Sequence, residues 1–336
     1  MKTLQRWQTS AKNGKEKGVN ELFKAFAAAS VLLQDDGSNV GKLNKTSSQK
    51  QASSAVRRFK YRIESGSVFD ELLIFMTRDM PAVLGEVFER PAADSEDGVQ
   101  QKIWRPQKSK KWAGFAKAVS EYCRNLLALL EAVTESDMTS WVLKAIGTTL
   151  PFFVAIPLLP RKLLKVSLSL WAIGEEAVRV RAYFTIRNLV EMFPKKLLPL
   201  AMKGMYLTYI RHTKTSNPKS LPRVNFLVAC ITDVFGMNVQ LAYEIAFTYI
   251  RQLAMTLRTA ISGKAKVGAS FSSLPSFMLL IRFVSLCVCY QNSTGLVCSW
   301  PFVNALRCWG QVFSQYSAKD ELGLLVYPYI QVSIFH

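Results

Sequence analysis

The sequence has few of the residues that most enzymes and metal sites need. Its 336 residues include only two histidines, His212 and His336, and no cysteine pair with the CxxC spacing. Zinc sites built from cysteine and histidine pairs therefore lack their ligands. A nucleophilic relay would have to use His212, and the adjacent Arg211 and Lys214 disfavour a base that must accept a proton. No glycine-rich phosphate loop follows a predicted strand. We therefore predict a protein that is not an enzyme and uses no cofactor, metal or small-molecule substrate.

Acidic side chains are also scarce. The chain has 43 Lys and Arg against 24 Asp and Glu, a formal net charge of +19. A field of this sign attracts polyanions, of which nucleic acid is the usual one. An anionic membrane surface and a soluble basic protein without a polyanionic ligand are the two alternatives.

Signals for secretion and membrane insertion are weak. The amino-terminal residues contain no continuous apolar core of the kind found in a signal peptide. Charged side chains interrupt both long apolar stretches, 141–171 and 274–290, and the second is short for a membrane span. The six cysteines form no secreted framework, so we expect unpaired thiols in a reducing compartment. No membrane partner is expected.

Helical periodicity, by contrast, is abundant. Apolar residues recur in steps of three and four, which places them on one face of a helix. One predicted helix carries Phe115, Val119, Tyr122, Leu126, Leu129, Leu130 and Val133. A second begins at the N-cap Asn238 and buries Val239, Ala242, Ala246, Ile250, Leu253, Leu257 and Ile261. We expect Ser136 and Asp137 to cap a further helix, and Pro199 to lie in the first turn of a helix over 195–210.

These patterns predict an all-α fold. Successive amphipathic helices with short connections favour stacked helix pairs, an α-solenoid of HEAT or armadillo-like type. No convincing alternating strand is present, and no repeat of fixed period is legible in the letters. The solenoid is therefore inferred from the succession of helices.

The segment YIRQLAMTLRTAI, at 249–261, resembles the most characteristic stretch of the nucleolar complex protein 2 family. Further similar segments occur in the expected order, among them RWQTSAKNG, YRIESGSVFDELLIFM, KKWAGFAKAVSEYCRNLLALLEAVTE, SWPFVNALRCWGQVFS and LVYPYIQ. The resemblance covers nearly the whole chain, although none of these motifs is chemical. It implies a nuclear protein of nucleolus and nucleoplasm that pairs with sister nucleolar complex proteins (1 and 3). It also implies that the protein accompanies large-subunit pre-ribosomal particles and their ribosomal RNA.

The chain departs from the family pattern at two places. Residues 267–291 separate segments that follow each other directly in the family, and residues 332–336 follow the family motif as a short tail. Lys266–Val267 and Gln291 are compatible with splice-site codons, so we interpret the insert as a translated retained intron in an imperfect gene model. Family members are also expected to extend beyond both ends of this chain. The predicted organisation is a helical segment 1–34, a flexible polar loop 35–60, a solenoid core 61–266, the insert 267–291, carboxy-terminal helices 292–331 and the tail 332–336.

Nine basic residues are candidate contacts for RNA or a protein partner. Seven surround a predicted loop, and two lie seven residues apart on one helix: Lys195, Lys196, Lys203, Arg211, Lys214, Lys219, Arg223, Arg251 and Arg258. For the loop group, a phosphate contact and simple solvation are both open. For Arg251 and Arg258, a solvated face or an intramolecular salt bridge competes with a contact role. Three tryptophans embedded in helical periodicity, Trp171, Trp300 and Trp309, are expected in the core.

The resemblance and the charge together predict a non-enzymatic scaffold for assembly and transport of large ribosomal subunit precursors. The competing hypotheses are a nuclear chromatin- or RNA-binding regulator without a ribosomal role, and a solenoid of the transport-receptor type. The polar run RPQKSKK at 105–111 is either a weak nuclear-import signal or part of a solvated linker.

If residues 267–291 are an insert, their deletion should leave the melting temperature within a few degrees of the full chain, because shortening a long loop costs little. A thermal melt of the deletion variant beside the full chain measures this. A large loss of stability would show that the segment packs into the core.

Overall fold

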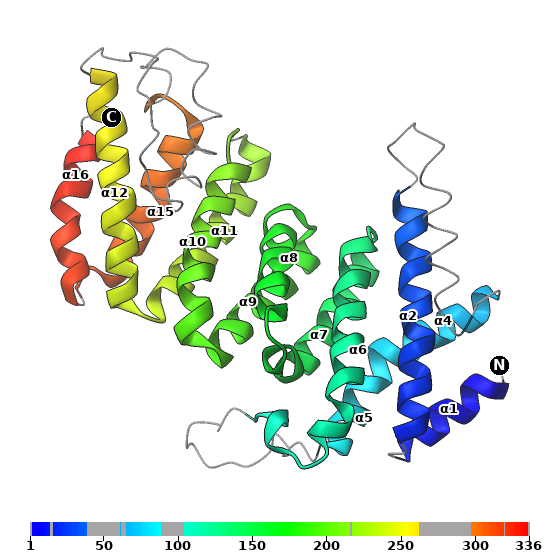
Figure 1. Ribbon diagram of the computed structural model, residues 1–336. Coiled ribbons are helices and arrows are strands. Elements are labelled where there is room, and N and C mark those ends of the chain that lie inside the picture. Colours follow the sequence, from blue (N-terminus) through cyan, green and yellow to red (C-terminus); the bar gives the residue numbers. More distant parts are fainter. Residues whose placement is uncertain are drawn as a thin grey trace, which may run out of the picture. The chain divides into compact units, whose positions relative to one another are not determined.

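The computed structural model describes residues 2–13, 16–38, 61, 65–88, 104–215, 217–261, 297–318 and 320–334. Within these ranges all regular structure is helical (Figure 1), which confirms the all-α prediction. The chain divides into two compact units, Met1–Leu197 and Leu198–His336. The insert 267–291 lies outside the described residues. Most of the predicted polar loop 35–60 does too, although its first four residues belong to a helix that ends at Ser38.

The first unit is built from helices that pack on their neighbours. Its elements are α1 (Lys2–Lys12), α2 (Glu16–Ser38), α4 (Gly66–Ile74), the π-helix η1 (Phe75–Asp79), α5 (Met80–Val87), η2 (Pro106–Lys108), α6 (Trp112–Ala132), α7 (Ser136–Ala155), α8 (Leu159–Ile173) and α9 (Glu176–Met192). The main packing pairs are α1 with α2, α2 with α6, α6 with α7, α7 with α9 and α8 with α9. The apolar stripe predicted for 115–130 forms the buried face of α6. Ser136 does not cap α7, because the N-cap position is Glu135 and no side chain there accepts from a first-turn N–H; Asp137 lies in the first turn.

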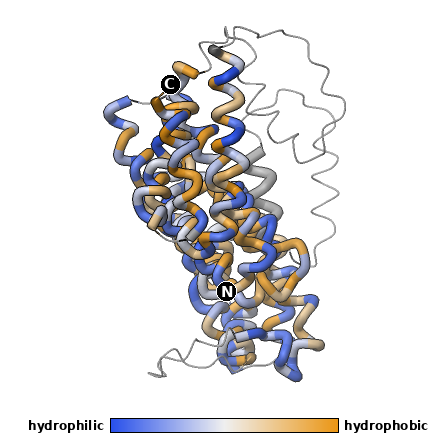
Figure 2. The backbone as a smooth tube through the Cα atoms, turned by 90° about the vertical axis from the view of Figure 1, so that its left-hand side faces the viewer, coloured by the Kyte–Doolittle hydropathy of each residue, from blue (hydrophilic) through white to orange (hydrophobic). Residues whose placement is uncertain are grey.

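Helices α7 and α9 pack side by side and have the same burial pattern. The order of buried and exposed residues over 141–150 recurs over 181–190, an offset of 40 residues. Each of the two helices follows a partner, α6 or α8, against which it packs. Figure 2 shows hydrophobic and hydrophilic residues alternating along the helices. The pattern of buried and exposed positions therefore repeats, whereas the amino acids at these positions differ.

Helix α7 is long and apolar enough to cross a membrane by length and composition alone. However, 56% of its most apolar window is buried inside the protein. Residues of α7 such as Ile146, Leu150 and Phe153 are fully buried by neighbouring helices. We therefore describe α7 as a core helix.

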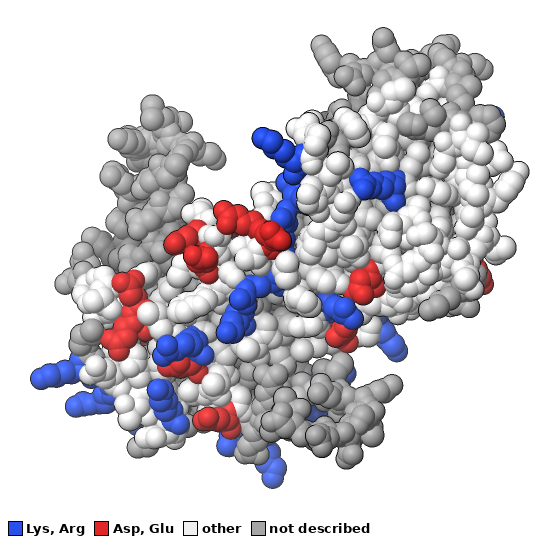
Figure 3. Space-filling model, turned by 180° about the vertical axis from the view of Figure 1, so that it is seen from behind, with Lys and Arg blue, Asp and Glu red and all other residues white. Residues whose placement is uncertain are grey.

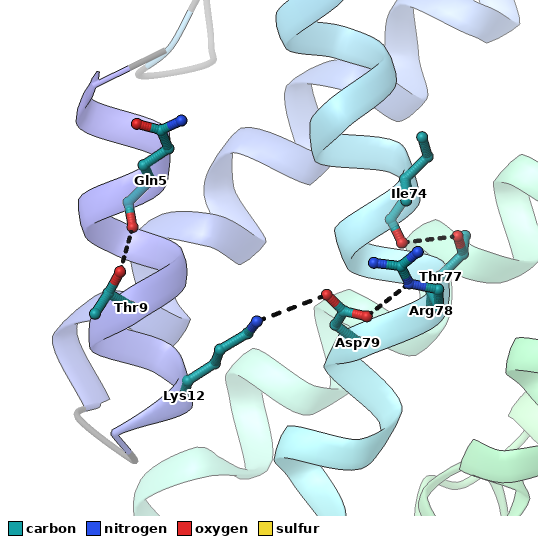
Figure 4. A network of polar contacts seen from close by, with 7 residues as sticks. All are labelled: Gln5, Thr9, Lys12, Ile74, Thr77, Arg78 and Asp79. Carbon is teal, nitrogen blue, oxygen red and sulfur yellow. Dashed lines mark hydrogen bonds and ion pairs between the residues drawn. The ribbon is translucent and has the colours of Figure 1, made fainter.

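Polar contacts fasten α1 to the π-helix segment (Figure 4). Lys12 of α1 approaches the Asp79 carboxylate at 4.0 Å, and the Arg78 Nε donates to the same carboxylate at 2.8 Å. The Lys12 ammonium also lies 5.8 Å from the centre of the Phe75 ring. Because Lys12 and Arg78 are largely exposed, these contacts orient α1 more than they stabilise it.

The π-helix leaves one backbone carbonyl without a partner inside its own helix. The Met80 N–H donates to the Phe75 carbonyl, five residues back. The next bond of that pattern would join residue 81 to Met76, but Pro81 has no N–H. The Tyr122 hydroxyl of α6 donates to the Met76 carbonyl instead, at 2.8 Å. Burial raises the pKa of Tyr122 well above its ordinary value, so this donor keeps its proton.

The second unit is formed by most of α10 (Pro194–His212) and by η3 (Pro218–Ser220), α11 (Leu221–Gly236), α12 (Val239–Ile261), α15 (Trp300–Tyr316), η5 (Asp320–Leu325) and α16 (Val326–Ile334). Its core surrounds Trp309, which contacts the rings of Tyr206, Phe235, Tyr249 and Phe313. The predicted N-cap of α12 is confirmed, since the Asn238 side chain accepts from the Leu241 N–H at 3.0 Å.

The structure differs from the expectations at three further residues. Pro199 lies inside α10, beyond its first turn, because the helix begins at Pro194. Trp171 and Trp309 are fully buried as expected, but Trp300, in the first turn of α15, is half exposed. Val332, the first residue of the predicted tail, is buried and packs in a cluster with Leu257 and Phe302.

The Tyr122 bond gives a stability prediction. Tyr122→Phe keeps the ring between α2 and α6 but leaves the Met76 carbonyl buried and unpaired, which should cost about 1–3 kcal/mol of unfolding free energy. Denaturant unfolding measures the loss. As the control, Tyr327→Phe removes a hydroxyl from a largely exposed ring. Equal stability of the two variants would contradict the role given to Tyr122.

Candidate nucleic-acid and partner interface

The predicted basic tract follows α10, the loop after it and the start of α11. Lys195 and Lys196 are exposed in the first turn of α10, in the first unit. Lys203 is half-buried in the middle of α10. Arg211 lies in the last turn of α10, and the remaining three residues follow the helix: Lys214, Lys219 and Arg223. The tract is therefore not one patch. On the face seen in Figure 3, basic side chains are likewise scattered among acidic ones.

The carboxyl end of α10 is fixed to α15 by a buried polar network. The Tyr209 hydroxyl donates to the Asn304 carbonyl at 3.2 Å. The Asn304 side-chain amide donates to the Thr213 carbonyl at 2.9 Å, and the Thr213 hydroxyl donates to the Tyr209 carbonyl at 2.8 Å. Asn304 and Thr213 are almost completely buried. The bond from Thr213 pairs the Tyr209 carbonyl, one of the last four of α10, which the helix cannot pair by itself, and the other two bonds join this end to α15.

Arg223 has a structural role in this corner. Its Nη2 reaches from α11 and donates to the His212 carbonyl at 3.2 Å. A guanidinium at this place satisfies the helix end and complements its partial negative charge. The turn between the two helices is closed by Ser220, whose hydroxyl donates to the Asn217 carbonyl at 2.8 Å. Arg223 therefore positions the corner and is not a freely available cation.

The pKa of His212 is influenced by three nearby cations. Its pKa is lowered, first by burial and then by the positive charges of Arg211, Arg223 and Lys214. Their charges therefore act on one imidazole, and we call Arg211, His212, Lys214 and Arg223 the corner cluster. Lys219 lies on the exposed turn η3 beside it in sequence. Such a concentration of positive charge can hold a phosphate, whereas it disfavours a general base.

Lys195 and Lys196 are apart from the corner cluster. They stand at the opposite end of α10, which is the amino-terminal end. The Lys196 ammonium lies 5.5 Å from the centre of the Phe193 ring, which is a cation–π contact. The helix end offers N–H groups to anions as well, but nothing in the geometry joins this site to the corner.

Arg251 and Arg258 are exposed on the outer face of α12. Among the described residues neither forms an ion pair or a hydrogen bond through its side chain. No salt bridge within the described part of the chain explains them; a solvated face and a contact with another molecule are the other two interpretations.

The basic run 105–111 is attached to the fold. Pro106 is buried in the 3₁₀ turn η2, and the Gln107 side chain donates to the Ala155 carbonyl at 2.8 Å. The Lys111 ammonium donates to the Val87 carbonyl at 3.3 Å. Most of its side chains are nevertheless exposed, so an import signal and a solvated linker both stay predictions for this run. Residues 89–103, which precede this run, lie outside the described residues.

A family model described as the Noc2p family matches residues 196–335. The chain is 26% identical over 315 residues to the nucleolar complex-associated protein 2 of Arabidopsis thaliana, which covers 94% of this chain and 36% of the relative. It is 25% identical to nucleolar complex protein 2 of Drosophila melanogaster over 94% of this chain and 35% of the relative. An uncharacterized NOC2 family protein of Schizosaccharomyces pombe is 24% identical over 99% of this chain. The resemblance to the nucleolar complex protein 2 family is thereby confirmed, and the chain spans about a third of the length of the two nucleolar complex relatives.

The lowered pKa of His212 predicts a pH dependence of stability. At pH values above about 6.5 the imidazole is neutral in both folded and unfolded chains. As the pH falls below that value, the unfolded chain takes up a proton that the folded chain resists, so the unfolding free energy decreases until the pH passes the folded pKa.

Denaturant unfolding at a series of pH values tests this, with His212→Gln as the comparison. The variant should lose less stability than the natural chain between neutral pH and the folded pKa of His212. Parallel curves for both proteins would contradict the electrostatics of the corner cluster.

Proposed function

We propose that this chain, which carries a Noc2p family domain, is a non-enzymatic component of a nucleolar complex that acts in assembly and transport of large ribosomal subunit precursors. The observation that carries the proposal is similarity over 94% of the chain to relatives named as nucleolar complex protein 2. Those names support a nuclear and nucleolar location and a role in ribosome biogenesis. Because the chain spans about a third of these relatives, the partners of the whole protein are part of the proposal.

The partners that we propose are sister nucleolar complex proteins (1 and 3) and large-subunit pre-ribosomal particles with their ribosomal RNA. The net charge of +19 favours a polyanionic ligand. The corner cluster supplies cations whose charges all act on the His212 imidazole. The outer face of α12 supplies two arginines without a partner among the described residues. A protein that connects RNA and other proteins needs both kinds of surface.

We also propose that helices α6–α9 form two HEAT-like repeats. Two consecutive helix pairs, α6–α7 and α8–α9, have second helices that pack side by side. Those second helices show the same burial pattern at an offset of 40 residues. This length is in the range of HEAT repeats, and stacked repeats of this kind provide long surfaces for large ligands.

The chemistry of the described residues is consistent with action by binding. No group of three or more His, Cys, Asp or Glu side chains among them is placed to hold a metal ion. The thiols of Cys123 and Cys308 are buried, and burial raises the pKa of both, so neither is a reactive thiolate. Similarity to the Noc2p family, and not these observations, is the main reason for proposing a non-enzyme.

Affinity purification of the tagged protein from nuclear extract tests the function. Sedimentation with large-subunit precursors, together with sister nucleolar complex proteins, is the expected result. Recovery with chromatin and no ribosomal assembly factor would favour the regulatory alternative. Recovery with Ran and transport cargo would favour a transport receptor, and either outcome would overturn the proposal.

The corner cluster predicts salt-dependent and weakly sequence-dependent RNA binding. Reversing Arg211, Lys214 and Lys219 to glutamate should lower the affinity for single-stranded RNA. It should also flatten the log–log salt dependence by about 0.7 for each phosphate that the variant no longer neutralises. Arg223 is left intact because it caps α10. The matched control reverses three exposed cations of α8: Arg161, Lys162 and Lys165. Reversal of Lys195 and Lys196 tests the other end of α10 separately.

His212 gives an independent readout of the same event. A phosphate at the corner cluster opposes the positive charges that lower its pKa, so RNA should raise the pKa of His212 in an NMR titration. If RNA binds with no change at His212 and the corner variant binds normally, the corner is a solvated surface.

A further inference from the structure

The outer face of α12 combines apolar and cationic side chains. Phe247, Arg251, Met255 and Arg258 follow each other at spacings of four, four and three, so they share one face of the helix. All four are exposed, Met255 to 60%. The buried residues Ile250 and Leu257 lie on a different face of α12. The Phe247 ring stacks on that of Tyr243, whereas Met255 is 60% exposed.

Helix α16 lies along the flank of α12. The two helices contact each other and stand side by side in Figure 1. Ala254 of α12, next in sequence to Met255, packs against the cluster that contains Val332 of α16. The outer face of α12 therefore borders α16.

Helix α16 adds a second apolar stripe. Tyr327, Ile330 and Ile334, spaced by three and four, are exposed, the first to 72% and the last to 69%. Leu324, in the preceding turn, is 70% exposed. The segment 324–334 contains no charged residue. Single exposed apolar residues are ordinary, but a set on two adjacent helices marks an interaction site.

The charges on this surface select its partner. Arg251 and Arg258 stand between and beside the apolar residues of α12 without an acidic partner among the described residues. This differs from Arg223, whose guanidinium completes a helix end. Arginine and methionine are favoured in protein interfaces, where an arginine can pair with a carboxylate on the other side.

We propose that the surface formed by Phe247, Arg251, Met255 and Arg258 of α12 and by Tyr327, Ile330 and Ile334 of α16 binds an acidic amphipathic helix of another protein. The apolar stripe of that helix would cover Met255 and the α16 residues, and its carboxylates would pair with the two arginines. Such a helix presents anchors every three or four residues, which matches the spacing on both elements.

An RNA ligand fits this surface less well. Bases could stack on Phe247 and Tyr327, but the α16 part of the surface adds two isoleucines and no cation for a phosphate. The inference that this surface binds an acidic helix rests on the surface alone and does not depend on the function proposed above.

The test uses two designed amphipathic peptides of about 20 residues, long enough to form a helix. Both have the same leucine stripe; one carries glutamate and the other lysine at the flanking positions. Fluorescence anisotropy with the full chain should show binding of the glutamate peptide only. Arg251→Glu with Arg258→Glu should weaken it by about tenfold and admit the lysine peptide.

Two control pairs match the variants. Lys117→Glu with Arg124→Glu reverses two exposed cations at the same seven-residue spacing on α6 and should change nothing. Tyr327→Ser with Ile334→Ser should reduce binding of the glutamate peptide, whereas Leu158→Ser with Ile173→Ser, at similarly exposed positions of the first unit, should not. Circular dichroism checks that each variant is folded.

Three results would overturn the inference. These are no binding of the glutamate peptide, equal binding of both peptides, and binding that the α12 and α16 variants leave unchanged. Competition of the glutamate peptide by polyuridine RNA at this surface would assign it to nucleic acid instead.

Discussion

Each helix of this protein has to bury an apolar stripe against its neighbours, and the remaining features depend on that requirement. Helices α6 to α9 meet it as consecutive pairs, in which α7 and α9 repeat one pattern of buried faces with different residues. A stripe in steps of three and four covers less than half of a helix circumference. The opposite face is left for solvent or for another molecule, and its side chains decide what the protein can bind.

Backbone groups at irregular points are paired by side chains from other helices. Tyr122 supplies the donor that Pro81 cannot give to the π-helix, and Asn304 and Arg223 pair carbonyls at the end of α10. The second case positions Arg211 and Lys214, two of the cations in the RNA contact that we propose. The contacts of each basic residue in such a corner therefore decide whether it builds the corner, as Arg223 does, or belongs to the proposed RNA contact.

The helices themselves could be predicted from the sequence. The periodicity over 115–130 defines a helix whose buried face matches the expectation. The helix after the N-cap Asn238 buries Ala242, Ala246, Ile250 and Leu257 as expected, whereas Val239 and Leu253 are only partly buried. Trp300 and Trp309 belong to one apolar helix, yet Trp300 is half exposed. The two residues are nine positions apart, which places them on opposite sides of α15. Letters describe periodicity along one helix, whereas exposure depends on which other helices cover it.

The candidate site could be predicted only in part. Charge clustering along the sequence finds Arg211 and Lys214, but it also groups them with Lys195 and Lys196 at the other end of α10, and it cannot recognise Arg223 as a cap. The π-helix and the exposed stripe of α16 have no signal in the sequence, since both arise from how separate elements meet. The 40-residue repetition was invisible for the same reason: burial repeats while residue identity does not.

The role that we propose for this basic helical protein is action on precursors of the large ribosomal subunit. Ultraviolet cross-linking in living cells, followed by sequencing of the RNA attached to the tagged protein, tests this role directly. We expect precursor ribosomal RNA of the large subunit as the dominant species. Cross-linking to messenger RNA or to no RNA, with the protein retained on chromatin, would contradict it.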